Sequence, residues 1–122
     1  MSTDYVEAQN HFMETFGKMA REIPGTIGGF GQMHAEACKA GALDHKTKEL
    51  MNLAIAIVIR CEGCITSHMQ DAIKLGATRE EILETIGVAV MMAGGPGTVY
   101  GSKAYEAMDQ FLKEKAKIGS NN

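Results

Sequence analysis

Hydrophobic residues recur every three or four positions along most of the chain, which is the spacing of one face of an α-helix. Within residues 4–22, Phe12, Phe16 and Met19 follow this spacing. Asp4 precedes them and can cap the helix, because its carboxylate accepts hydrogen bonds from amides of the first turn. The pattern therefore predicts a first amphipathic helix over residues 4–22.

Glycine and proline divide the rest of the chain into further segments of helical pattern. The first break begins at Pro24 and continues through Gly25, Gly28 and Gly29, and the last break is residues 94–97. Between and beyond these breaks we expect helices over residues 29–39, 45–59, 61–75, 78–93 and 99–117. The expected fold is all-α: one domain over residues 1–122, built as a bundle of about six helices.

Two of these helices carry recognisable N-terminal caps. Asp44 is placed to cap the third helix, and Thr78 with Glu81 has the spacing of a capping box for the fifth. The third helix begins with polar residues and becomes apolar nearly all round over residues 50–59. We therefore expect its second half to be buried.

The β-branched run over residues 53–59 also permits a strand. A strand followed by a Cys-x-x-Cys motif and a helix is the thioredoxin arrangement. That fold needs several more strands and a proline facing the disulfide. The chain offers no other clear strands and has only Pro24 and Pro96, so the helical interpretation is favoured.

Composition narrows the functional classes. The chain has 122 residues, of which 45% are hydrophobic and 22% charged, as in an ordinary globular domain. A net charge of −3, with no run of basic residues, argues against nucleic-acid binding. The longest apolar run is too short for a bilayer, and no secretory signal is visible. Three cysteines are too few for a secreted disulfide scaffold, so we expect a cytoplasmic protein without a membrane partner.

The candidate chemistry lies in residues 61–68, where Cys61 and Cys64 form a Cys-x-x-Cys pair and His68 follows. On a helix that starts at Cys61, these three side chains share one face. The imidazole can then exchange a proton with the Cys64 thiol, and thiols react as thiolates. A second thiol can trap a sulfenic acid as a disulfide. The segment predicts a redox site. We favour Cys64 as the attacking thiol because His68 lies one turn away, although the helix dipole acts more strongly on Cys61.

Other interpretations of the cysteine pair stay open. It could be half of a structural zinc site, but such a site usually needs a second pair of ligands. Cys38, His34 and His45 are scattered in the sequence and supply no such pair. Cys38 is expected to be a small buried residue, and the two histidines are expected at the surface or at helix caps.

The spacing from Glu49 to Cys61, Cys64 and His68 resembles the Glu…Cys-x-x-Cys-x-x-x-His motif of AhpD-like proteins in the carboxymuconolactone decarboxylase family. The resemblance covers residues 43–97, which form the motif-bearing core. It includes two shorter matches, Lys46-x-x-Glu49-Leu50 and Ala77-Thr78-x-Glu80-Glu81-Ile82. The chain departs from AhpD in being shorter and in carrying Gly63 where AhpD has a histidine.

The resemblance implies a helical subunit that forms a homotrimer or homohexamer, with thiol-dependent peroxidase or disulfide reductase activity and no cofactor or bound metal. It assigns Cys64 as the peroxidatic cysteine, Cys61 as the resolving cysteine, and Glu49 with His68 as a proton relay. An external dithiol, on a lipoylated or thioredoxin-like protein, would supply electrons. Family members that decarboxylate the muconolactone ring lack the cysteine pair, so that reaction is a less favoured alternative. A zinc-binding structural or sensing oligomer is another.

Spacing alone does not bring Glu49 to the cysteines. At about 1.5 Å per residue, Glu49 lies roughly 16 Å along its helix from the turn at Arg60. In a simple helical hairpin it would face a point near Ala72, beyond His68. Its expected role therefore rests on the resemblance.

Overall fold

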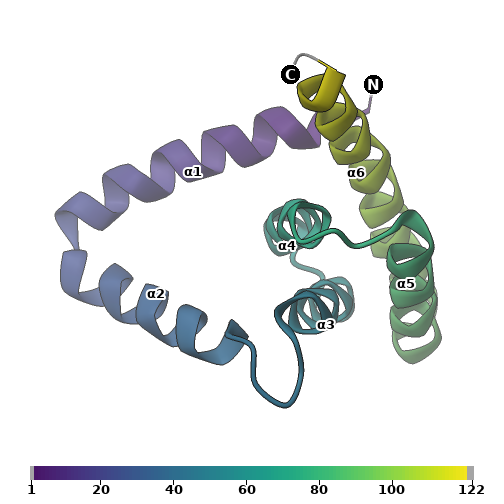
Figure 1. Ribbon diagram of the computed structural model, residues 1–122, viewed down its shortest axis with the longest axis horizontal. Helices are drawn as coiled ribbons and strands as arrows, with labels where there is room; N and C mark the ends of the chain where they lie inside the picture. The colour runs from purple at the N-terminus through teal and green to yellow at the C-terminus, as the bar shows by residue number, and fades with distance from the viewer. Residues whose placement is uncertain (1, 121–122) are drawn as a thin grey trace.

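The computed structural model describes residues 2–120, which form six α-helices and no strand. Figure 1 shows their arrangement. The helices are α1 (Tyr5–Glu22), α2 (Pro24–Cys38), α3 (His45–Val58), α4 (Glu62–Lys74), α5 (Arg79–Ala93) and α6 (Gly95–Ser120). The predicted all-α fold of about six helices is confirmed, and the thioredoxin-like alternative is wrong.

Helices α3, α4, α5 and α6 pack together around the hydrophobic core. α5 lies against both α6 and α3, while α4 lies against α3 and α6. The largest fully buried core side chains in this part of the chain include Leu53, Ile57, Ile65, Met69, Ile82 and Met108. None of the helices in the described part of the chain is long and apolar enough to cross a membrane.

Helices α1 and α2 form an arm on one side of this core (Figure 1). The start of α1 is attached to α6, because the amide of Tyr5 donates a 2.7 Å hydrogen bond to the side chain of Gln110. From there α1 passes over α4, and α2 turns back toward α3. Residues of the arm and of α4 together line a pocket.

The predicted helix caps are present. The carboxylates of Asp4 and Asp44 accept hydrogen bonds from the first turns of α1 and α3. Thr78 and Glu81 form a reciprocal capping box at α5. These local interactions satisfy amides that a helix N-terminus otherwise leaves unpaired, so short sequence motifs set these boundaries.

Two predicted helix starts are wrong, for the same physical reason. α2 begins at Pro24 and α6 begins at Gly95, with Pro96 in its first turn. Proline lacks an N–H that the first turn would leave unpaired anyway, so it begins a helix well. Only Gly94, at a φ of 69°, breaks the chain between α5 and α6. The glycines after Pro24 lie inside α2.

The expected burial of the second half of α3 is only partly correct. Leu53 and Ile57 are fully buried, but Ile55 is 54% exposed and Ile59 is 64% exposed. α3 packs against α4 and α5 on one side and leaves an apolar strip uncovered on the other.

Candidate dithiol site

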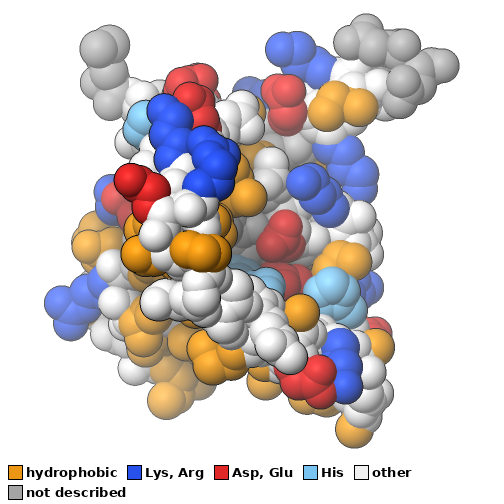
Figure 2. Space-filling model, turned by 90° about the vertical axis from the view of Figure 1, so that its left-hand side faces the viewer, with side chains coloured by type: hydrophobic (Ala, Val, Ile, Leu, Met, Phe, Trp, Pro, Cys, Tyr) orange, Lys and Arg blue, Asp and Glu red, His pale blue; other side chains and the backbone are white. Residues whose placement is uncertain are grey.

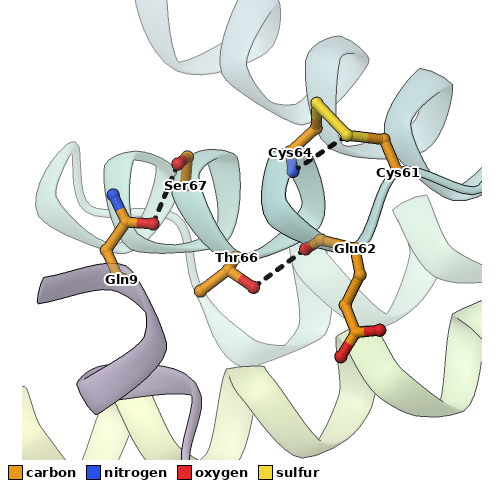
Figure 3. The surroundings of a disulfide bond; sticks show 6 residues. All are labelled: Gln9, Cys61, Glu62, Cys64, Thr66 and Ser67. Atoms are coloured by element: carbon orange, nitrogen blue, oxygen red, sulfur yellow. Dashed lines mark hydrogen bonds between the residues drawn. A yellow bond between two sulfur atoms is a disulfide. The ribbon is translucent and has the colours of Figure 1, made fainter. Parts of the chain in front are cut away.

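Cys61 and Cys64 form a disulfide at the N-terminus of α4 (Figure 3). Cys61 is the N-cap residue, and its Sγ accepts a 3.2 Å hydrogen bond from the amide of Cys64. The sulfur thus occupies the place of a capping oxygen, where the helix dipole favours negative charge. The preceding residue, Arg60, has a left-handed backbone conformation with a φ of 61° and joins α3 to this cap.

Two further hydrogen bonds fix the first turns of α4 (Figure 3). The hydroxyl of Thr66 donates to the carbonyl of Glu62 at 2.9 Å. The hydroxyl of Ser67 donates to the side-chain oxygen of the buried Gln9, also at 2.9 Å. Because Gln9 lies on α1, the second bond ties the disulfide-bearing helix to the arm.

Glu49 of α3 and His68 of α4 form a hydrogen-bonded pair next to the cysteine motif. Oε2 of Glu49 lies 2.8 Å from Nδ1 of His68, and the glutamate side chain is only 1% exposed. Burial favours the neutral acid, but the hydrogen bond and charge of His68 outweigh it, so the pKa of Glu49 is below its usual value. An ionised carboxylate only accepts hydrogen bonds, which makes Nδ1 the donor. Nε2 is then the ring nitrogen available for proton exchange.

Glu49 is connected to the cysteine motif by its hydrogen bond to His68. The hairpin register places it near residue 72, and carboxylate oxygens of Glu49 and Asp71 do lie within 4.8 Å of each other and of a His68 ring nitrogen. Burial, followed by the negative charge of Glu49, raises the pKa of Asp71. The chain thus places both acidic groups around one imidazole.

The disulfide opens into a cleft of about 660 Å³ between α4 and the arm. Cys61, Cys64 and His68 line it, whereas Glu49 lies behind His68 and does not. Its apolar wall comes from α1 and α2 and consists of Phe12, Met13, Phe16 and Phe30. Figure 2 looks onto this side of the molecule and shows histidine and acidic side chains gathered in a hollow. A small organic molecule could meet the sulfurs there.

Sequence reasoning missed His34, which was expected at the surface or at a cap. Its ring stacks on that of His68, with centroids 6.0 Å apart and planes 14° apart, and it lines the same cleft. Cys38 is buried as predicted, and the Asn52 amide lies 3.4 Å from its Sγ. His34 and Cys38 are not scattered: donor atoms of both and of Glu49 lie within 4.8 Å of one another. Their i, i+4 spacing on one helix was the available clue.

These features define a class: an all-helical dithiol protein whose disulfide caps a helix next to a histidine that is hydrogen-bonded to a buried glutamate. Residues 26–107 match the model of the carboxymuconolactone decarboxylase family. The chain belongs to this family, and its fold is AhpD-like. The predicted resemblance to this family is therefore confirmed.

Similar proteins agree with this assignment. A carboxymuconolactone decarboxylase family protein from Legionella pneumophila has a structure with a TM-score of 0.86 and 43% identity, covering 90% of this chain and 98% of its own. A family protein from Thermotoga maritima gives a TM-score of 0.72 and 29% identity, covering 86% and 95%. An uncharacterized protein from Cupriavidus necator is 31% identical over 89% of this chain and 96% of its own length.

Proposed function

We propose that this protein is a thiol-dependent peroxidase that reduces hydroperoxides with the Cys61–Cys64 dithiol. One observation carries the proposal: both cysteines face a cleft that His68 also lines, and the buried Glu49 carboxylate holds that histidine at 2.8 Å. A redox-active pair needs substrate access and a group that moves protons, and this arrangement offers both. The description of the Thermotoga maritima relative suggests a part in an antioxidative response, which agrees with this chemistry.

The reaction begins with the reduced pair. Cys64, one helical turn from His68, gives its proton to Nε2 and attacks the outer oxygen of the hydroperoxide as thiolate. The O–O bond breaks, Cys64 becomes a sulfenic acid, and the imidazolium returns the proton to the departing alkoxide, giving an alcohol. The Cys61 thiol then displaces the hydroxyl group as water and forms the disulfide.

Glu49 assists by holding His68. Its carboxylate accepts from Nδ1 and stabilises the imidazolium that forms when Cys64 loses its proton. The amide of Cys64 and the N-terminus of α4 stabilise charge on Cys61, which favours this sulfur as leaving group when the disulfide is reduced. An external dithiol, on a lipoylated or thioredoxin-like protein in the cytoplasm, would supply the two electrons. No step requires a metal or cofactor.

We also propose that the subunit forms a homotrimer or homohexamer. Large apolar side chains stay exposed on α3 and α5, and these include Met51, Ile55, Val58, Val88, Met91 and Met92. Both Met91 and Met92 are 70% exposed, an unfavourable state for an isolated subunit. Sedimentation equilibrium tests the assembly, and a monomer at micromolar concentration would contradict it.

The peroxidase proposal is tested by counting thiols. The reduced Cys38→Ala variant is treated with one equivalent of an organic hydroperoxide, and we expect loss of two thiols within seconds with a Cys61–Cys64 disulfide by mass spectrometry. In Cys61→Ser the reaction should stop at a sulfenic acid on Cys64, whereas Cys64→Ser should not react rapidly.

Two persistent thiols after many minutes would refute the peroxidase proposal. The same reduced protein would then be mixed with small-molecule disulfides, because a reductase would lose both thiols in that assay. A sulfenic acid that forms only on Cys61, in the Cys64→Ser variant, would instead reverse the assigned roles of the two cysteines.

A further inference from the structure

A second group of chemically reactive side chains lies behind the cleft, where α2 meets α3. His34 and Cys38 are one turn apart on α2, and Glu49 faces them from α3. One donor atom from each lies within 4.8 Å of the other two: a ring nitrogen, a sulfur and a carboxylate oxygen. Cys38 and Glu49 are buried and His34 is half-buried. The proposed peroxidase chemistry leaves His34 and Cys38 without a role.

The separations suit a small cation. Zinc binds sulfur at about 2.3 Å and nitrogen or oxygen at about 2.0–2.2 Å, so ligand atoms in a tetrahedral site lie roughly 3.5 Å apart. Closing from separations of at most 4.8 Å requires small side-chain rotations. A mixed sulfur, nitrogen and oxygen set suits Zn²⁺ and excludes Mg²⁺ and Ca²⁺, which take oxygen ligands.

The Cys38 sulfur also has a hydrogen-bond donor beside it. The Asn52 amide donates to the Cys38 sulfur at 3.4 Å, and a donor at this atom stabilises a thiolate.

We propose that His34, Cys38 and Glu49 form a binding site for a divalent transition metal of the Zn²⁺ class. Three protein ligands leave a fourth position for water or a cleft ligand. Zinc displaces the thiol proton of Cys38, so binding strengthens as pH rises. Glu49 belongs to both this site and the pair with His68, so metal would compete with the imidazole for the carboxylate. The metal site itself does not rest on the proposed peroxidase function.

The disulfide form allows a direct test with Co²⁺ as the probe. Among the three cysteines only Cys38 is then a free thiol, so a thiolate-to-cobalt charge-transfer band reports Cys38 alone. We expect one equivalent of Co²⁺ to give this band and Zn²⁺ to remove it. The band should be absent in Cys38→Ala. In His34→Gln the affinity should fall at least about 10-fold, whereas His11→Gln, which changes an exposed histidine on α1, should bind as the wild type does.

Two outcomes would overturn the proposal. The first is no stoichiometric binding of Co²⁺ to the folded disulfide form. The second is binding without a thiolate band, which would place the metal on the neighbouring set of Glu49, His68 and Asp71. If Cys38→Ala does not fold, His34→Gln decides, because unchanged cobalt affinity in that variant would also refute the site. None of these measurements depends on turnover with peroxide.

Discussion

Replacement of His68 by leucine should reveal how strongly the buried carboxylate depends on its partner. Glu49 is 1% exposed, and its carboxylate accepts a 2.8 Å hydrogen bond from His68. Removing the partner of a buried charge costs about 3–5 kcal/mol, because the charge then remains without compensation. The Asn52 amide lowers the pKa of Glu49 and stays in place, so we expect the lower end, about 3 kcal/mol at pH 7.

The sharper prediction concerns whether a second substitution, Glu49→Gln, raises or lowers the free energy of unfolding. In the wild type, Glu49→Gln loses a hydrogen bond to a charged carboxylate and should cost about 1.5–3 kcal/mol. In the His68→Leu background the same change removes an unpaired buried charge, so it should restore at least about 1 kcal/mol. Glu49→Gln is therefore destabilising when the imidazole is present and stabilising when it is absent.

The pH dependence follows from the pKa of Glu49, which is lowered in the folded wild type. Its contribution to stability is fully present above the unfolded value of about 4.3 and is lost as pH falls through the folded value. In His68→Leu the imidazole no longer offsets the effect of burial on the pKa of Glu49. The stabilisation by Glu49→Gln in that background should therefore grow as pH rises from about 4 to 7.

Urea unfolding measures these differences for the wild type, the two single variants His68→Leu and Glu49→Gln, and the double variant. The disulfide is kept intact and all four proteins are studied at one concentration. His45→Leu is the matched control, because its Nε2 lies 3.8 Å from the same carboxylate but its side chain is 48% exposed. That change should cost less than about 1 kcal/mol. Additive effects of the two main substitutions would refute the reasoning, as would a loss of under 1 kcal/mol in His68→Leu.

Two further predictions concern the scaffold and are read from thermal unfolding. A Cβ at Gly97 would lie 2.9 Å from that of Ala93, so Gly97→Ala should cost about 1–3 kcal/mol, whereas Gly87→Ala, with nothing within 4 Å, should be neutral or stabilising. Equal effects would contradict a close α5–α6 contact. Arg60 has a φ of 61°, so Arg60→Gly should raise stability by up to about 1 kcal/mol and Arg60→Val should lower it.

The sequence predicted those parts of the structure that depend on nearby residues. The Asp44 cap and the Thr78–Glu81 capping box involve partners three residues apart, so composition within one turn specifies them. Cys61 and Cys64 are likewise neighbours on any helix. The prolines were misjudged because the same residue both interrupts and begins helices, and the choice at Pro24 and Pro96 depends on where the preceding helix stops.

The pair between Glu49 and His68 shows how far hairpin geometry alone can go. Two antiparallel helices joined near residue 60 place residue 49 opposite residue 72, and Asp71 does lie in the cluster. His68 is one turn earlier, a rise of about 5.4 Å, and the two long side chains cover that distance. The hairpin register therefore predicted which part of α4 Glu49 faces, while the length of the two side chains determined that His68 is its hydrogen-bond partner.

The cleft depends on contacts that no local pattern encodes. Its apolar wall lies on α1 and α2, where Phe12 and Phe30 remain about half exposed, and an amphipathic pattern would place such residues in the core. They face the disulfide because Tyr5 is held by Gln110 and Ser67 by Gln9, across 105 and 58 residues of sequence. The arm thus leaves apolar surface unburied in order to enclose reactive sulfurs. The spacing of the motif predicts its chemistry, whereas these distant polar contacts determine which molecules can reach the disulfide.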